Sequence, residues 1–336
     1  MELLKLNLSL VATACIAANM AFAEGEFGYL VELDVAYGKG VVSSGRTLVE
    51  RDLLLDVYTP SPNNVDYTKT NASPERLRPA VILVYGGGFQ RGGRRQAPYS
   101  ELDAVHSRME DYARLLTPLG YVSFVIEYRL APELPEPDTA LDADWILTMD
   151  EDLTDAGMRR VNFARDALGL GPLEGTEGKT VVWKTILSAA EDLEKAIAYV
   201  RASSERFGVD PDRIALGGHS AGAATVINTA LGLDVPLSAI FTLSPPLSAI
   251  DLSKSITSED ETPTLHVVSQ YDEPAVLEKA PGFTEAMRSA GVDYELVWIP
   301  GFPHFYPHNS PSLGDDGTRQ ALSKRLIRFL ESHLMK

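Results

Sequence analysis

The chain has 336 residues, of which 45% are hydrophobic, and its formal net charge is −17. This hydrophobic content is typical of a globular protein with a sizeable core, and the length suits one large domain. The negative charge argues against a nucleic-acid partner, because phosphates would be repelled.

Residues 1–23 have the features of a secretory signal peptide. Lys5 precedes an almost wholly apolar run at 6–18, and Ala21-Phe22-Ala23 provides the small residues of a cleavage site. The run is too short to span a bilayer as a stable helix, so we expect no stable membrane insertion. The sequence therefore predicts export, with cleavage after Ala23 into the periplasm or the medium.

Cys15 is the only cysteine and lies within that leader. A lipid anchor at Cys15 is the competing interpretation, but Ala12 stands where such signals usually carry an aliphatic residue. After cleavage at Ala23 the mature chain would have no thiol for a disulfide or a cysteine metal site.

Strand and helix patterns alternate along residues 24–336, which we expect to form one domain. Two early runs, 29–37 and 53–58, alternate partly and predict an antiparallel pair. Continuously apolar runs then predict buried strands at 80–85, 121–128, 214–217, 239–243, 264–269 and 294–299. Helical patterns lie between them at 107–116, 188–207, 274–290 and 319–334. This order predicts an α/β fold with a mostly parallel sheet and helices on both faces.

One segment, about 133–187, is too long for a minimal crossover connection. It contains helical stretches and glycine-rich breaks at 169–178. Long insertions in compact domains are often lids over a site, so a helical lid is our expectation, with a surface excursion as the alternative.

The sequence Gly218-His219-Ser220-Ala221-Gly222 matches the G-x-S-x-G pattern of a nucleophile elbow. The preceding residues 212–217 read as a short strand, and the small residues that follow are compatible with a helix. Because the motif stands in the strand–turn–helix context that it requires, we interpret Ser220 as a nucleophile.

A serine hydroxyl needs a base and an acid that orients the base, and in this arrangement they follow in the order Ser, Asp or Glu, His. Asp272 follows the strand expected at 264–269, and His304 follows the last expected strand. Both stand past carboxyl ends of strands, where open α/β sheets assemble their sites. We therefore predict a triad of Ser220, Asp272 and His304.

Other residues compete for these roles. Glu273 is an alternative acid and His308 an alternative base. His266 falls within an expected strand and reads as a core residue, while His219 occupies the variable position of the elbow. Asp251 could serve as the acid only if the strand at 239–243 ended unusually.

The glycine run in Tyr85-Gly86-Gly87-Gly88-Phe89 follows an expected buried strand. Backbone N–H groups in such a run can approach a developing oxyanion, and we assign that role to Gly87, Gly88 and Ala221. A phosphate cradle is the alternative, but no Lys-Ser/Thr pair follows the run.

These motifs resemble the α/β-hydrolase superfamily, and in particular its hormone-sensitive-lipase-like and carboxylesterase branches. Tyr85–Phe89 looks like their HGGG-type loop, and Tyr128-Arg129-Leu130-Ala131-Pro132-Glu133 is similar to a segment of small bacterial esterases. The segment 207–214 leading into the elbow is similar too. The resemblance implies an esterase fold and chemistry. Tyr85 in place of the lipase-like histidine and the long insertion both depart from the pattern.

Three arginines follow the glycine run, at Arg91, Arg94 and Arg95. One hypothesis makes them a positive rim that orients substrates carrying a carboxylate. The alternative is a surface loop whose arginines pair with the many acidic residues.

Trp145 and Trp183 are similarly open to two interpretations, as lid contacts to an acyl chain or as packing residues.

Together these features predict an exported serine esterase that acts on a small-molecule ester through an acyl-enzyme and needs no metal or cofactor. A serine peptidase, aminopeptidase-like, on the same triad is the second interpretation. A catalytically silent binding protein is the third. The substrate's acyl and alcohol parts and the oligomeric state do not follow from the sequence.

Overall fold

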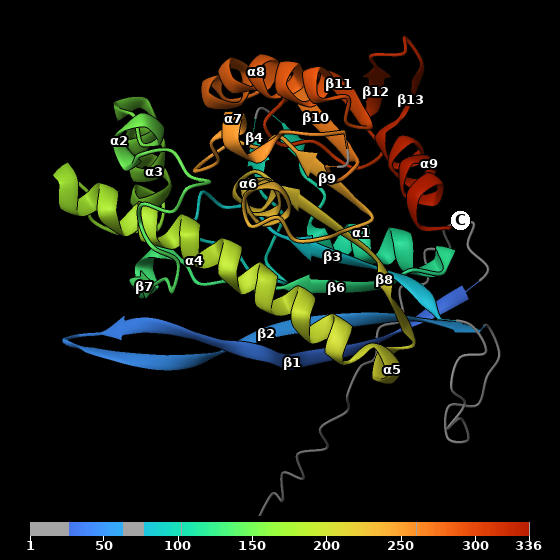
Figure 1. The fold of residues 1–336 in the computed structure, drawn as a ribbon, viewed down its shortest axis with the longest axis horizontal. Helices are drawn as coiled ribbons and strands as arrows, with labels where there is room; N and C mark the ends of the chain where they lie inside the picture. The colour runs from blue at the N-terminus through green and yellow to red at the C-terminus, as the bar shows by residue number, and fades with distance from the viewer. Residues whose placement is uncertain (1–26, 63–76, 102, 260, 336) are drawn as a thin grey trace, which may run out of the picture.

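The computed structural model describes residues 27–62, 77–101, 103–259 and 261–335 (Figure 1). The predicted leader 1–23, with Cys15 and the expected cleavage site, lies outside these residues. The connection between the second and third strands, residues 63–76, is likewise not described.

Eleven strands of the described chain form one sheet, in the order β13-β12-β11-β10-β9-β8-β3-β6-β2-β1-β7. Their bounds are β1 Phe27–Ser44, β2 Thr47–Pro62, β3 Arg78–Val84, β6 Val122–Ile126, β7 Pro135–Glu136, β8 Val209–His219, β9 Ala239–Leu243, β10 Thr264–Tyr271, β11 Tyr294–Pro303, β12 Pro311–Gly314 and β13 Arg319–Ala321. A separate short hairpin consists of β4 Ser100–Glu101 and β5 Ala104–Val105.

The sheet is mixed, which corrects the expectation of a mostly parallel one. The six central strands, from β6 to β11 in the order above, pair in parallel. The strands outside them pair antiparallel on both sides. The residues of β6 and β9 are buried throughout, as the continuously apolar runs predicted for strands covered on both faces. The parallel centre is the part that those runs predicted.

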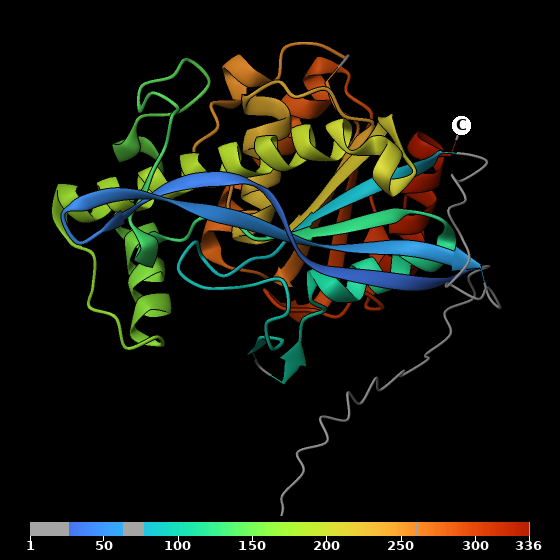
Figure 2. The same cartoon turned by 90° about the horizontal axis from the view of Figure 1, so that it is seen from below.

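Helices cover both faces of the sheet. Their bounds are α1 Met109–Leu116, α2 Met149–Asp152, α3 Asp155–Asp166, α4 Gly175–Ala202, α5 Ser204–Phe207, α6 Ala221–Ile227, α7 Leu252–Ser255, α8 Pro274–Ala290 and α9 Leu322–Leu334, with short 3₁₀ turns η1 Thr117–Leu119 and η2 Ala131–Glu133 and a π turn η3 Asn228–Gly232. Figures 1 and 2 show α4 and α6 on one face and α1 on the other.

Two predicted helices have different bounds in the structure. The helix expected at 188–207 begins instead at Gly175 and continues to Ala202 as α4. Of the glycines that suggested a break, Gly175 and Gly178 lie in its first turn, and Gly178 packs against the backbone of Leu173 with no room for a Cβ. The helix expected at 319–334 loses its first three residues to β13, which pairs with β12.

Strands β1 and β2 form a long twisted hairpin along one edge of the molecule (Figures 1 and 2). The turn at its tip pairs Ser44 with Thr47 and contains Gly45 at a φ of 67°. A short turn with a left-handed residue matches the twist of the flanking strands, which is why glycine is suited to it.

The insertion 133–187 contains β7, α2, α3 and the first turns of α4, which gather at one end of the molecule (Figure 1). Its main chain is joined to the core where Leu147 N donates to Ala249 O at 2.8 Å and Asp251 N donates to Trp145 O at 2.9 Å. Trp183 is buried within α4, and its indole N–H donates to Leu141 O at 3.4 Å. The insertion is thus bonded to the core, and both tryptophans pack within the protein.

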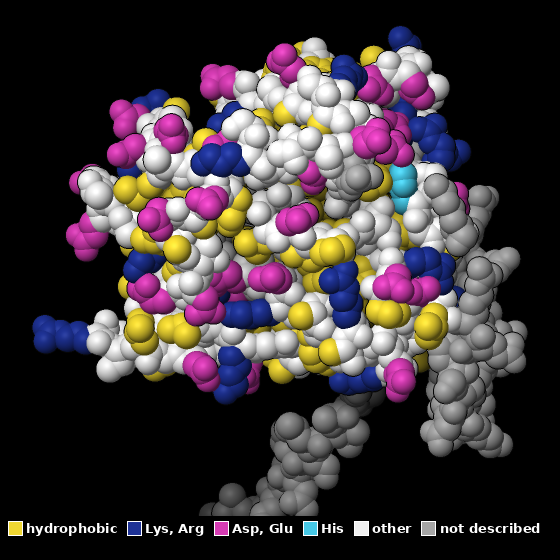
Figure 3. Space-filling model, in the orientation of Figure 1, with side chains coloured by type: hydrophobic (Ala, Val, Ile, Leu, Met, Phe, Trp, Pro, Cys, Tyr) yellow, Lys and Arg dark blue, Asp and Glu magenta, His cyan; other side chains and the backbone are white. Residues whose placement is uncertain are grey.

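Acidic and basic side chains are interspersed on the face shown in Figure 3. Despite the net charge of −17, this face carries no large area of one sign. Within the described ranges, no helix combines the length and the apolar character needed to cross a membrane.

Candidate active site

Ser220 stands at the sharp turn between β8 and α6, with φ 54° and ψ −123°. Such a positive φ is strained for a residue with a Cβ, and strain of this kind is characteristic of functional turns. Its amide donates to Leu243 O at 2.8 Å, which ties the turn to the end of β9. Gly222 lies against the carbonyls of Val84 and Tyr85, so that a Cβ at this position would clash with them. The turn therefore holds the serine against the end of β3.

The structure brings Ser220, His304 and Asp272 together in a hydrogen-bonded line. His304 Nε2 lies 2.8 Å from Ser220 Oγ, and His304 Nδ1 lies 2.6 Å from Asp272 Oδ1. The histidine is 3% exposed and the aspartate 6%. Both follow carboxyl ends of parallel strands, as the sequence predicted.

Asp272 is held by further donors. Its Oδ2 accepts from Ser244 Oγ at 2.5 Å and from the amide of Ser269 at 3.0 Å, and its Oδ1 accepts from the amide of Glu273 at 2.9 Å. Burial raises the pKa of this carboxyl, but the hydrogen bonds and the charge of His304 lower the pKa by more, to well below its usual range. Asp272 is therefore ionised at neutral pH.

Burial also works against a charged imidazole at His304 and by itself lowers its pKa. The hydrogen bond and the charge of Asp272 act in the opposite direction and leave the pKa of His304 above its ordinary value. The second carboxylate nearby, on Glu273, adds to this rise, while Arg160 opposes it. A histidine in this state readily accepts a proton from a serine hydroxyl.

The alternative residues lie elsewhere or serve other roles. His308 Nδ1 pairs with Ser107 Oγ at 2.7 Å, away from the elbow, and His266 is a fully buried residue of β10. Asp251 caps α7. Glu273 is near the site, but its Oε1 lies 3.8 Å from His304 Nε2 and not from Nδ1. Only Asp272, of the two carboxylates, is placed to orient the ring.

His219 supports the site although it is not a base. Its Nε2 lies 3.1 Å from the backbone carbonyl of His304, so its ring braces the loop that carries His304. Burial, and then the neighbouring His304 and His106, lower the pKa of His219 well below its usual value. The imidazole is therefore neutral and can donate from Nε2.

The glycine loop lies beside the serine. A Cβ at Gly86 would lie 2.9 Å from Ser220 Cβ, and Gly87 has a φ of 136°, at which a Cβ would meet the carbonyl of Arg91. In the part of the chain that the structure describes, the amides of Gly87 and Gly88 have no hydrogen-bond acceptor. These N–H groups are thus available to a ligand.

Tyr128 supports this loop from behind. Its hydroxyl donates to Tyr85 O at 3.0 Å, its ring stacks on Tyr85 at 4.7 Å, and it meets the edge of Phe89 at 6.3 Å. The amide of Ala131 donates to Phe89 O at 2.9 Å. The segment 128–133, which resembles a segment of bacterial esterases, therefore contacts the glycine loop at both of its ends.

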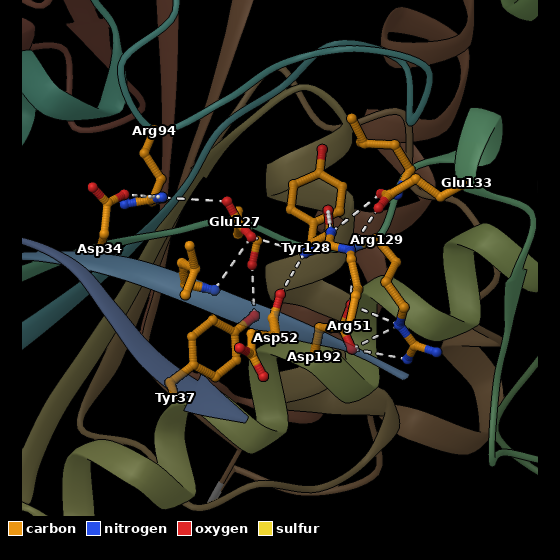
Figure 4. Close-up of polar contacts among 12 residues, drawn as sticks. Asp34, Tyr37, Arg51, Asp52, Arg94, Glu127, Tyr128, Arg129, Glu133 and Asp192 are labelled. Atoms are coloured by element: carbon orange, nitrogen blue, oxygen red, sulfur yellow. Dashed lines mark hydrogen bonds and ion pairs between the residues drawn. The ribbon is translucent and has the colours of Figure 1, made fainter. Parts of the chain in front are cut away.

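Charged side chains fix that segment in turn (Figure 4). Arg129, 1% exposed, pairs with Asp192 Oδ1 at 2.8 Å and with Glu191 at 3.0 Å, both on α4. Arg51 of β2 pairs with Glu127 at 2.8 Å and with Glu133 at 2.5 Å. The network connects the hairpin and α4 to the support of the glycine loop.

Arg94 and Arg95 do not form the free positive rim that was one hypothesis. Arg94 is 8% exposed and pairs with Asp34 and Asp56, and Arg95 pairs with the same two carboxylates. Arg91 lies over the ring of Tyr99 at 4.5 Å. The buried Asp56 on β2 and the hairpin residue Asp34 supply the countercharges, so the ion-pair alternative describes Arg94 and Arg95.

No cluster of three or more His, Cys, Asp or Glu side chains suited to a metal ion occurs among the described residues.

No protein-family model and no curated protein matches the chain. Solved structures of esterase 2 from Thermogutta terrifontis are similar in fold. The form phosphorylated by paraoxon is 18% identical, with 90% of this chain and 91% of that chain covered at a TM-score of 0.52. The propionate-bound form is 19% identical, with 81% and 84% covered at 0.51, and the apo form is 17% identical, with 89% and 91% covered at 0.51. The chain therefore has an α/β-hydrolase-like fold.

The sequence did not point to three residues that the structure places at or behind the site. Arg160 forms an ion pair with Glu273, Tyr128 braces the glycine loop and Ser244 donates a hydrogen bond to Asp272. Tyr128 stands in a motif that the resemblance had singled out, which was a usable signal. Arg160 had none, because its partner is more than a hundred positions away.

Proposed function

We propose that the chain is an exported serine esterase that hydrolyses carboxylic esters through an acyl-enzyme intermediate. The observation that carries this proposal is the line from Ser220 Oγ through His304 to Asp272, with contacts of 2.8 and 2.6 Å. These are the distances that a base-activated nucleophile requires.

In the first half of the reaction, Ser220 Oγ attacks the ester carbonyl carbon while His304 Nε2 takes the hydroxyl proton. The imidazolium is stabilised by the ionised Asp272. As the C–O bond of the tetrahedral intermediate breaks, Nε2 returns the proton to the departing alcohol oxygen. The second half repeats these steps with water as the nucleophile, and it releases the acid and the free serine.

The negative charge that develops on the carbonyl oxygen needs donors that are already in place. The amides of Gly87, Gly88 and Ala221 are our candidates. The first two have no acceptor in the described structure, and the third begins helix α6 directly after the nucleophile. Removing one donor from such a hole typically slows turnover by about 10²–10³-fold.

The fold shared with the Thermogutta esterase is in keeping with this chemistry. Its forms bound to propionate and phosphorylated by paraoxon are those of an enzyme that binds a short carboxylate and reacts with an organophosphate. Export, with cleavage after Ala23, and assignment to the lipase-like or carboxylesterase branch are parts of the proposal that rest on the sequence motifs.

The test uses protein beginning at residue 24. Hydrolysis of p-nitrophenyl esters from acetate to palmitate is compared with hydrolysis of aminoacyl p-nitroanilides, for the wild type and for Ser220→Ala. We expect ester turnover that the substitution abolishes. Serine-dependent cleavage of anilides in preference to esters would instead assign a peptidase, and ester turnover that survives in S220A would overturn the proposed mechanism.

A further inference from the structure

Helix α3 of the insertion reaches the catalytic site at two points. Arg160 forms an ion pair with Glu273, the residue after the triad aspartate. One turn further along α3, Ala164 Cβ would lie 3.9 Å from a Cβ at Gly88. The same helix therefore touches the histidine side and the glycine-loop side of the site.

The ion pair lies beside His304 Nε2, the proposed base. Glu273 Oε1 is 3.8 Å from His304 Nε2, the atom that hands its proton to the departing oxygen. An alcohol oxygen within hydrogen-bond distance of Nε2 has its first carbon atoms beside this carboxylate and its partner. The side chains of Arg160 and Glu273 are 42% and 21% exposed, so a substrate can contact both.

We propose that Arg160 and Glu273 form the wall of the leaving-group subsite and that, as a pair, they select esters of uncharged alcohols. The inference rests on the proposed esterase function. A cationic alcohol would be attracted by the carboxylate and repelled by the guanidinium, and an anionic one the reverse. Either would have to separate the pair, whereas a neutral alcohol leaves it intact.

The same pair acts on the base. The groups that face His304 are Asp272 and Glu273 at the end of β10, Arg160 on α3, and the histidines His219 and His106. Burial lowers the pKa of both neighbouring histidines, that of His106 to about 4, so they carry no charge near neutral pH. The charges that differ between variants of the pair are then those of Glu273 and Arg160 alone.

Substrate charge gives the first test. Acetylcholine and 3,3-dimethylbutyl acetate have alcohols of the same shape, one cationic and one neutral, and release of acetic acid is followed by pH-stat titration. We expect the wild type to favour the neutral ester. Arg160→Gln should raise the choline-to-neutral ratio of kcat/KM by about five- to tenfold, and Glu273→Gln should lower it. The double variant has no ion pair to separate, so its ratio should exceed that of the wild type, and an unchanged ratio would overturn selection by the pair.

Arg159→Gln is the matched control, because it removes the same charge from the adjacent position of α3. Arg159 lines a different cavity together with Glu174 and Lys179. An equal change of the choline-to-neutral ratio in R159Q would show that the overall charge of the protein causes the effect, and it would contradict the proposed subsite.

The acidic limb of kcat/KM against pH gives a second readout that a structural role would not produce. Glu273→Gln should lower the apparent pKa of the base by about 0.5 pH units, and Arg160→Gln should raise it by a similar amount. Shifts in the same direction, or no shift together with an unchanged substrate ratio, would overturn the inference while leaving serine-dependent ester turnover intact. Loss of serine dependence would instead remove the proposed function itself.

Discussion

Different forces hold the insertion 133–187 and the sheet edge that carries Ser220, Asp272 and His304. We call this sheet edge the proposed catalytic edge. Ser220, Asp272 and His304 follow the ends of parallel strands, so the backbone ladders of the sheet fix their positions. The segment before α2 has two main-chain hydrogen bonds to the core, whereas α2 and α3 themselves are also tied by side-chain pairs such as Lys279 to Asp152 and Arg165 to Gln90. A ladder survives the exchange of a side chain, but an ion pair does not. We therefore expect substitutions at the edge to affect chemistry and substitutions in the insertion to affect attachment and selectivity.

The largest effect should come from the base. His304→Ala removes the proposed acceptor of the serine proton and should reduce kcat by about 10⁶-fold, as loss of the histidine of a catalytic triad does. His308→Ala is the matched control, because the His308 ring pairs with Ser107 and not with Ser220. Steady-state kinetics with a p-nitrophenyl ester decides between them, and a comparable loss in H308A would contradict the assignment.

The sequence predicted the strands that carry Ser220, Asp272 and His304 better than it predicted the insertion, for a physical reason. Strand β9 and helix α8 have the predicted bounds, because continuous apolar runs and helical periodicity are local signals. The juxtaposition of Ser220, Asp272 and His304 follows from their places after strand ends. The partners of Arg94 on the hairpin are 38 and 60 positions away, and no local pattern predicts such a pair. The antiparallel pair of β1 and β2 was predicted, but the short outer strands β7, β12 and β13 were missed, since pairing between distant segments decides them.

The attachment of the insertion is tested at Lys279, whose Nζ lies 2.9 Å from Asp152 Oδ1. The aspartate is buried, and burial raises its pKa despite the lysine. Lys279→Met leaves this carboxylate without its cation and should destabilise the protein by about 3 kcal/mol at neutral pH. Because a raised carboxyl pKa means that the protonated form is favoured on folding, the loss should shrink as the pH falls.

Urea unfolding at pH 5 and pH 8, with limited proteolysis of α2 and α3, measures this effect. Lys179→Met provides the control, because its partner Asp150 is 80% exposed and water screens the pair. Equal destabilisation by the two substitutions would show that burial of Asp152 is not what matters.

A smaller effect on activity is expected from Tyr128→Phe. The ring and its stacking on Tyr85 remain, but the hydroxyl that holds the Tyr85 carbonyl is lost. If the glycine loop then positions its amides less well, kcat should fall about tenfold while KM changes little. Tyr121→Phe is the control, since the Tyr121 hydroxyl is buried and has no hydrogen-bond partner in the described structure. A similar loss of kcat in Y121F would refute the positioning role.

The smallest effect concerns the core behind the proposed catalytic edge. His266 on β10 is 0% exposed, and burial lowers its pKa to about 3. The unfolded chain has a histidine of ordinary pKa, near 6.5, and therefore binds a proton at pH 5.5 that the folded chain does not. Stability should thus fall with pH below about 6.5, and this residue should account for about 1 kcal/mol between pH 6.5 and 5.5. In His266→Phe, urea unfolding should show a shallower loss over this interval whatever the absolute stability of the variant. If the unfolding free energy of the variant had the same slope against pH as that of the wild type, the His266 ring would already be protonated in the folded protein. Packing of a neutral ring against Phe283, at 4.9 Å between ring centroids, would then not be what stabilises this side of the sheet.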